Sequence, residues 1–444
     1  MIKKLKDNIV FIKYLKNTLW MLTEKLIMMC VVLFVNILVA RYLGPDNFGY
    51  LAYSVSLVAL FSIATHMGLG GLVVKELVSE PKESAKVIGT VFYLKLFGAV
   101  IGFFILLCIN LLTEEMLSLN FLVLFIISFS IFLKPFEVVD FWFIANVQVK
   151  YTAITNTIAL IITSLLKVIF VFMSMNLLWF AFSNFIQSFI IAILFIYFFQ
   201  KKIKLPLSKL KFSLEKAKYL LSKSWMIMLG GIFAIIYLKI DQIMLKWIIG
   251  DASVGVYSVA SSLSEIWYFL PTIIVTSLFP KIIEMKENMN LNYNKRLQQL
   301  FDFLFIISFL LATFVSFIAN DLILFLYGEE YILSGDILSI HIWAGVFIFM
   351  RALFSKWIIL EDILMFSLIT QGFGALTNIV LNFILIPEYG VYGAAIATLL
   401  SYAIASYIVL VFYSKTRKIF WMMTKAMISP IRYIIIGIKA KVNG

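Results

Sequence analysis

Twelve long runs of apolar residues, separated by short polar stretches, make up most of the chain. Each run has the roughly 20 residues that an α-helix needs to cross a hydrocarbon core, and none shows the alternation of an outer-membrane barrel strand. The pattern predicts an all-α polytopic membrane protein. Its spans are expected near residues 19–40, 50–72, 87–110, 119–139, 151–173, 177–199, 223–249, 257–279, 297–320, 337–360, 365–387 and 391–414.

The composition agrees with this class of protein and limits the cross-links and metal sites that the chain can form. Hydrophobic residues make up 63% of the chain and charged residues only 14%, which excludes a water-soluble protein of this length. Cys30 and Cys108 both fall inside predicted spans, so neither a disulfide framework nor a metal site is expected, and no cofactor is predicted. The first apolar run is as long as a span and leads into further runs, so a cleaved signal peptide is not expected.

In a soluble protein the formal net charge of +13 would suggest that the protein binds nucleic acid. In a membrane protein the positions of the charged residues along the chain are more informative than their sum. Acidic residues dominate the connections on one side of the predicted spans, with Arg41 as the exception. By the positive-inside rule both termini are cytoplasmic, and nucleic acid is not an expected partner. The basic residues gather on the other side: Lys3, Lys4, Lys6, Lys13, Lys16, Lys75, Lys82, Lys86, and the stretches 201–223, 281–296 and 415–441.

The polar stretch between the sixth and seventh spans divides the chain into two halves. We expect an N-terminal six-helix lobe (1–199), a cytoplasmic basic linker (200–222), a C-terminal six-helix lobe (223–414) and a cytoplasmic basic tail (415–444).

A glycine pair recurs after the first span of each half: Gly44 with Gly49, and Gly250 with Gly255. This repeat at equivalent positions favours an internal duplication. The alternative is that any short hairpin selects glycine for its turn geometry. A third glycine-rich corner, IPEYGVYGAAIATLLSY, opens the last span.

Charged side chains lie inside several predicted spans. Each costs about 2.5 to 3.5 kcal/mol at bilayer depth, so such residues normally face a partner or a wet cavity. The basic members outnumber the acidic ones, and a cavity that they line would suit an anionic cargo. The basic residues are Lys95, Lys134, Lys167, Lys239, Lys246, Arg351 and Lys356; the acidic residues are Glu137, Asp241 and Glu265.

Spacing indicates which of these charges share a surface. Lys134 and Glu137 are three residues apart and could neutralise each other, which is the alternative to a role in cargo binding. Asp241 lies well round its helix from Lys239, so we expect it to contact another span or the other half. The two histidines, His66 and His341, are expected to pack or to form an interhelical hydrogen bond rather than to relay protons.

The sequence contains no P-loop, no HExxH and no nucleophile elbow, which removes ATP hydrolysis and the commonest hydrolase chemistries. A non-enzyme is therefore predicted. Transport would draw its energy from an ion gradient, the membrane potential or the cargo gradient.

Three segments resemble one family, the Wzx-type polysaccharide flippases, which belong to the superfamily that includes the multidrug extruders and the lipid II flippases. They are ARYLGPDNFGYLAYSVSL (40–57), LKIDQIMLKWIIGDASVGVYSVASSLSEIWYFLPTIIVTSLFPKI (238–282) and TNIVLNFILIPEYGVYGAAIATLLSY (377–402). The resemblance covers the whole chain in the number and order of spans. It implies two six-helix lobes around a central cavity, in the inner membrane of a bacterium.

The resemblance also implies a cargo and roles for the interior charges. The cargo would be an undecaprenyl-pyrophosphate-linked oligosaccharide, moved to the outer leaflet by alternating access for O-antigen, capsule or another surface glycan. A polysaccharide polymerase and a chain-length regulator are the partners it suggests. We expect Lys95, Lys134, Lys167, Lys239, Lys246 and Arg351 to bind the pyrophosphate, and Asp241, Glu265 and Glu137 to serve gating or H⁺ or Na⁺ coupling. The chain uses lysine where arginine would recognise phosphate more selectively.

Three alternatives remain open at this point. A multidrug extruder would export cations and would favour acids over lysines in its cavity. A membrane glycan polymerase or ligase would need a long external loop, whereas the longest expected here lies near 320–336. A membrane scaffold would have little reason to keep so many charges at depth. Ion coupling and export driven by the membrane potential also stay open as energy sources.

Overall fold

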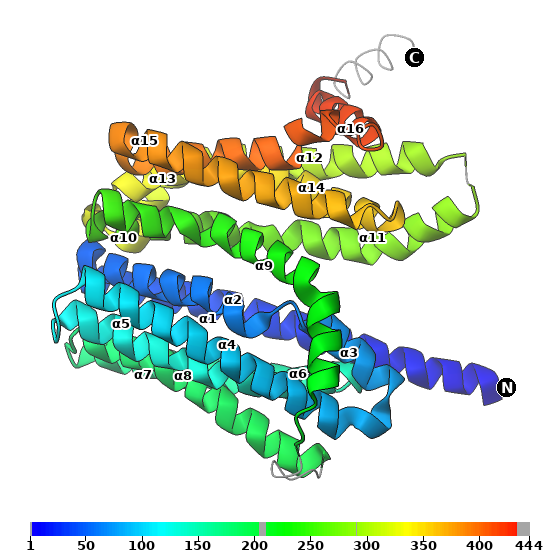
Figure 1. The fold of residues 1–444 in the computed structure, drawn as a ribbon. Coiled ribbons are helices and arrows are strands. Elements are labelled where there is room, and N and C mark those ends of the chain that lie inside the picture. Colours follow the sequence, from blue (N-terminus) through cyan, green and yellow to red (C-terminus); the bar gives the residue numbers. More distant parts are fainter. Residues whose placement is uncertain (1, 204–209, 290, 433–444) are drawn as a thin grey trace. The chain divides into compact units, whose positions relative to one another are not determined.

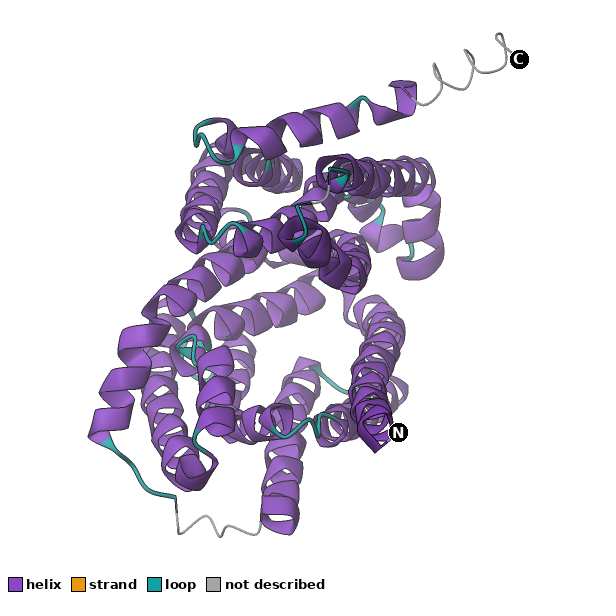
Figure 2. Cartoon of the chain, turned by 90° about the vertical axis from the view of Figure 1, so that its right-hand side faces the viewer, coloured by secondary structure: helices purple, strands orange, loops and turns teal. Residues whose placement is uncertain are grey.

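The computed structural model describes residues 2–203, 210–289 and 291–432, and over these residues it contains helices and loops but no strand (Figure 2). The chain folds into two compact units, residues 1–239 and 240–444. The boundary lies inside one long helix, α9 (Leu214–Ile248). The predicted lobe boundaries at 199, 222 and 414 stay a prediction.

In the described part of the first unit there are eight helices, three short irregular helical turns and the beginning of α9. Its core gathers apolar side chains from α3, α4, α6, α8 and the first turns of α9, with Val73, Ile88 and Phe143 fully buried. In order, the elements are α1 (Ile2–Phe61), α2 (Ile63–His66), α3 (Gly70–Ser79), η1 (Pro81–Glu83), α4 (Ser84–Thr113), α5 (Leu119–Phe129), η2 (Ser130–Glu137), α6 (Val138–Ala145), α7 (Lys150–Phe172), α8 (Leu177–Phe198) and η3 (Phe199–Ile203).

The second unit continues from the rest of α9. Its elements are α10 (Asp251–Glu265), η5 (Ile266–Tyr268), α11 (Phe269–Glu287), α12 (Tyr293–Tyr327), η6 (Glu329–Tyr331), α13 (Leu333–His341), α14 (Ala344–Leu360), α15 (Leu364–Ser406), η7 (Ile408–Val411) and α16 (Arg417–Met427).

The twelve predicted spans are all present. Ten helical segments of the described residues are long and apolar enough to cross a membrane. Two of them, Ile27–Ser79 and Met365–Val411, each contain two predicted spans that meet at a non-helical glycine, Gly44 or Gly390. The prediction of an all-α polytopic membrane protein with about twelve spans in two lobes is therefore confirmed.

The glycine corners have a stereochemical cause. Gly44 (φ 71°, ψ 172°) and Gly250 (φ 132°, ψ −176°) occupy a backbone region that is essentially restricted to glycine. At the third corner Gly390 has φ 59°, and a side chain on Gly393 would meet the carbonyl oxygen of Leu385, so the two arms of this hairpin pack closely. Pro45 follows the first corner and helps to end the preceding helix. The long helices that contain or border the three corners, α1, α9 and α15, are labelled in Figure 1.

Among the described residues, four predicted spans are interrupted beside a polar residue that the sequence had placed at membrane depth. The second span breaks after His66, the fourth at η2, the eighth at η5 after Glu265, and the tenth after His341. The second and eighth spans, like the fourth and tenth, occupy equivalent places in the two halves. This correspondence supports the predicted duplication.

The predicted linker and tail are partly helical. Residues 214–222 begin α9, and Lys216 of this segment contacts Glu76 and Glu80 of the first unit at 2.5 and 2.9 Å. The tail begins with α16. Residues 204–209 of the linker and 433–444 of the tail lie outside the described residues.

Candidate functional site

The interior charges form two separate clusters, one in each unit. The first joins Lys95, Lys134 and Glu137, and the second surrounds Asp241. Each cluster is assembled by helices of one unit alone.

In the first cluster one carboxylate lies between two ammonium groups. Lys95 Nζ donates to Glu137 Oε2 at 3.2 Å, and Lys134 Nζ donates to Glu137 Oε1 at 3.0 Å. Lys95 is fully buried on α4, and its Nζ also lies 5.4 Å from the centre of the Phe141 ring. The neutralisation of Lys134 by Glu137 that the spacing allowed is confirmed, but the second lysine leaves the cluster with a formal charge of +1.

The break in the fourth span positions this carboxylate. Pro135 lies inside the 3-10 turn η2, where it removes one backbone donor, and Glu137 is the last residue of the turn. The three members differ in accessibility: the side chain of Lys95 is 1% exposed, whereas those of Glu137 and Lys134 are 26% and 32% exposed. Lys134 is therefore the member best able to reach a ligand while keeping its ion pair.

In the second cluster Asp241 accepts three hydrogen bonds from neutral side chains. Its Oδ2 accepts from the hydroxyls of Tyr257 and Thr398, both at 2.6 Å, and its Oδ1 accepts from Asn382 Nδ2 at 2.5 Å. Asp241 is only 2% exposed. The expectation that Asp241 contacts other spans rather than Lys239 is confirmed, because its partners lie on α10 and α15.

A second layer surrounds these partners. Asn382 Nδ2 also donates to Asn378 Oδ1 at 3.3 Å, and both amides are fully buried. The ring of His341 meets the ring of Tyr257 edge to face at 5.8 Å between centroids. The predicted packing role of His341 is thus what the structure shows. Carboxylate, hydroxyl and amide oxygens are hard donors of the kind that alkali and alkaline-earth cations prefer.

The remaining predicted residues make no hydrogen bond to Glu137 or Asp241 among the contacts described above. Lys246 Nζ contacts Asp251 Oδ2 at 2.6 Å across the Gly250 turn. Arg351 donates to the carbonyl oxygen of Ala405 at 3.1 Å. Glu265 is half-buried at the break of the eighth span. Lys167 and Lys239 are half-buried, and neither makes an ion pair with a described residue of its own unit.

The sequence predicted no role for Tyr257, Asn378, Asn382 and Thr398. One signal was available, since the two asparagines lie four residues apart in an otherwise apolar span and therefore on one face of the helix. The hydrogen bonds of Asn382 and Thr398 to Asp241 join residues 141 and 157 positions apart, which helical periodicity does not predict.

Spans that break beside buried charges, on an all-helical fold of two units, define a polytopic membrane protein that holds polar groups at membrane depth. The chain belongs to the family of polysaccharide biosynthesis proteins, which it matches over residues 14–286.

A curated relative and two solved structures add to this assignment. The chain is 30% identical over 175 residues to the "Probable flippase AglR" of Haloferax volcanii, a match that covers 38% of this chain and 36% of the relative's own length. Its fold is similar to "Lipid II flippase MurJ, inward closed conformation" (TM-score 0.71, 18% identity, 95% of this chain and 93% of that one). It is also similar to an inward-facing MATE family transporter of the MOP superfamily (TM-score 0.66, 14% identity, 90% and 95%). At these identities the two structures establish the fold alone.

Proposed function

We propose that this protein is a flippase that moves undecaprenyl-pyrophosphate-linked oligosaccharide repeat units from the cytoplasmic to the outer leaflet of a bacterial inner membrane. The family and the exporter fold support the reaction class. The observation that carries the proposal is the Lys95–Glu137–Lys134 cluster, whose positive charge is held between the third and fourth spans and suits an anionic cargo group. The glycan would serve O-antigen, capsule or another surface polysaccharide.

In this proposal Lys134 makes the first contact with the pyrophosphate, because it keeps about a third of its side chain exposed. Lys95 keeps its ion pair with Glu137. Because Glu137 retains this second partner, an arriving anion can compete with the carboxylate for Lys134. Lys167, Lys239, Lys246 and Arg351 are proposed as further cationic contacts along the path of the cargo. Both termini are placed in the cytoplasm by the positive-inside rule.

Asp241 is proposed as the coupling carboxylate. Asp241 accepts hydrogen bonds from a phenol, an alcohol and an amide, none of which carries a positive charge, so a proton or a Na⁺ ion would stabilise this buried carboxylate. A proton or ion bound at Asp241 would draw α10 and α15 toward α9. Occupancy of the site would in this way change the positions of these helices. Glu265 and Glu137 are proposed as gating carboxylates at their span breaks.

The test is flipping by the full-length protein in proteoliposomes. A fluorescent undecaprenyl-pyrophosphate oligosaccharide reports accessibility to an impermeant quencher, with H⁺ and Na⁺ gradients and the membrane potential set independently. We expect Lys134→Gln to slow flipping and Asp241→Asn to abolish its dependence on the ion gradient, while the exposed control Lys75→Gln changes neither.

Different results would contradict different parts of the proposal. Flipping by Lys134→Gln at the wild-type rate would remove the cationic cluster from cargo binding. Flipping that depends only on the potential, worth about 2.3 kcal/mol per charge per 100 mV, would remove the coupling role of Asp241. A folded wild-type protein that flips no lipid-linked oligosaccharide but exports organic cations would make it a multidrug extruder.

A further inference from the structure

A pocket of about 650 Å³ lies at the basic end of the second unit, between the first turns of α12 and the helix α16. Four basic side chains line it: Lys295 from α12, Lys418 and Lys425 from α16, and Arg432 beyond that helix. Its lining contains no acidic residue. The pocket belongs to one unit and is separate from both buried charge clusters.

The positive charge in this pocket is largely uncompensated. Arg432 is paired with Asp302, one turn further along α12. Lys418 Nζ donates to the amide oxygen of Asn294 at 2.6 Å, which orients the ammonium group without neutralising it. Lys295 and Lys425 are exposed and make no ion pair with a described residue. Three of the four basic side chains that line the pocket therefore have no ionic partner among the described residues.

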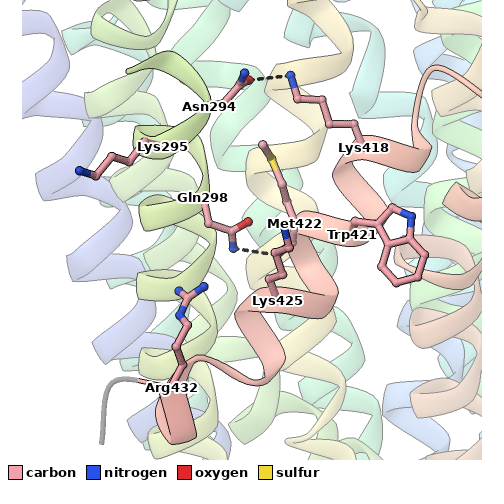
Figure 3. Close-up of a pocket in the computed structure, with 8 residues that line it drawn as sticks. All are labelled: Asn294, Lys295, Gln298, Lys418, Trp421, Met422, Lys425 and Arg432. Carbon is pink, nitrogen blue, oxygen red and sulfur yellow. Dashed lines mark hydrogen bonds between the residues drawn. The ribbon is translucent and has the colours of Figure 1, made fainter. Parts of the chain in front are cut away.

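The pocket is a built feature rather than a chance grouping of surface lysines. Gln298 Nε2 donates both to Asp302 Oδ1 at 2.8 Å and to the carbonyl oxygen of Met422 at 2.9 Å, which fastens α16 to α12 (Figure 3). On the inner face of α16, Ile419 and Met423 are fully buried. The position of the cations is thus fixed by the packing of the two helices.

The outer face of α16 is that of a helix lying at a membrane surface. Trp421 is 57% exposed and points away from α12, and the apolar side chains of Ile428 and Ile431 are 54% and 61% exposed. Lys418, Trp421, Lys425 and Ile428 follow one another at spacings of three or four residues, so they form one stripe. Cationic and aromatic side chains in such a stripe are typical of helices at the level of lipid headgroups.

We propose that this pocket binds the phosphate group of an anionic phospholipid in the leaflet on the basic side of the membrane. The three unneutralised lysines would surround the phosphate, and the acyl chains would lie along Trp421, Ile428 and Ile431. A basic pocket beside a membrane span is a known means of recognising lipid headgroups. The site is independent of the proposed flippase reaction, and α16 would be held against α12 more firmly when it is occupied.

The test measures lipid binding to the full-length protein in zwitterionic nanodiscs. Phosphatidylglycerol is titrated into the discs and bound lipid is counted by native mass spectrometry, with inorganic pyrophosphate as a soluble competitor. The pocket variant is Lys295→Gln, Lys418→Gln and Lys425→Gln combined. Arg432 is kept, because its removal would disrupt the ion pair of the buried Asp302.

A matched control removes the same number of charges outside the pocket: Lys75→Gln, Lys82→Gln and Lys415→Gln combined, all of them exposed residues on the basic side. Near an anionic headgroup each lysine contributes about fivefold to binding, so we expect the pocket variant to bind phosphatidylglycerol on the order of 100-fold more weakly. The control variant should bind like the wild type, and millimolar pyrophosphate should not displace the lipid.

Two results would overturn the proposal. Equal losses in the pocket variant and the control would mean that bulk charge, and not this pocket, attracts the lipid. Binding of pyrophosphate in preference to phosphatidylglycerol would mean that the pocket serves a soluble phosphate. Thermal unfolding of the two variants in the same nanodiscs checks that both are folded, and the assay does not depend on flipping activity.

Discussion

Removal of the Glu137 carboxylate should destabilise the first unit through the lysine that it leaves behind. In Glu137→Gln the ammonium of Lys95, whose side chain is 1% exposed, loses its partner at 3.2 Å. Breaking a buried ion pair from one side costs about 3 to 5 kcal/mol. Since Glu137 is itself 26% exposed, we expect the lower end of this range, about 3 kcal/mol.

Removal of both partners should cost less than removal of the carboxylate alone. In Lys95→Met the carboxylate keeps Lys134 at 3.0 Å, so we expect a loss of only about 1 kcal/mol. The double variant Lys95→Met/Glu137→Gln contains no buried ammonium at this position and should also lose about 1 kcal/mol. The expected coupling free energy between the two residues is therefore about 3 kcal/mol, favouring the intact pair.

The assay is unfolding in mixed micelles by added dodecyl sulfate, with helix content followed by circular dichroism. Glu284→Gln serves as the control, because its partner Lys281 is 66% exposed and an exposed pair contributes at most about 1 kcal/mol. The reasoning is refuted if Glu137→Gln unfolds with the wild-type free energy, or if the double variant loses the sum of the two single losses. Either result would mean that Lys95 finds another partner or access to water.

Three glycines give further predictions for the stability of the protein. In Gly98→Ala the new methyl group would meet the carbonyl oxygen of Ala64, so α2 and α4 must separate, and we expect a loss of several kcal/mol in the same unfolding assay. Gly71→Ala, with open space around it, should be neutral or stabilising. Gly250→Ala also enters open space, but its φ of 132° should cost about 1 to 3 kcal/mol, and equal stability of Gly250→Ala and Gly71→Ala would contradict this conformational argument.

The sequence was sufficient for features that depend on residues close together in the chain. Span length follows from apolar runs, and the corners at Gly44, Gly250 and Gly390 follow from the restriction of their backbone conformations to glycine. The pairing of Lys134 with Glu137 followed from helical spacing, although the sequence left it as one of two alternatives. These are all interactions within a single span or turn.

Other features depend on packing and could not be predicted in this way. The pairing of Lys246 with Asp251 crosses a turn, where helical spacing does not apply. The second lysine on Glu137 comes from another helix, 42 residues earlier. The environment of Asp241 needs three helices to meet. The pocket beside α16 depends on how that helix packs against α12. The sequence alone indicated only a basic tail.

The partners of Asp241 impose an order on biosynthesis. Tyr257 is made 16 residues after Asp241, whereas Asn382 and Thr398 follow 141 and 157 residues later. At synthesis rates of about 5 to 20 residues per second, the carboxylate waits roughly 7 to 30 s for its asparagine. Throughout that interval Tyr257 is the only one of these three partners that has been synthesised, so Asp241 cannot reach its full set of hydrogen bonds until the two arms of α15 are complete.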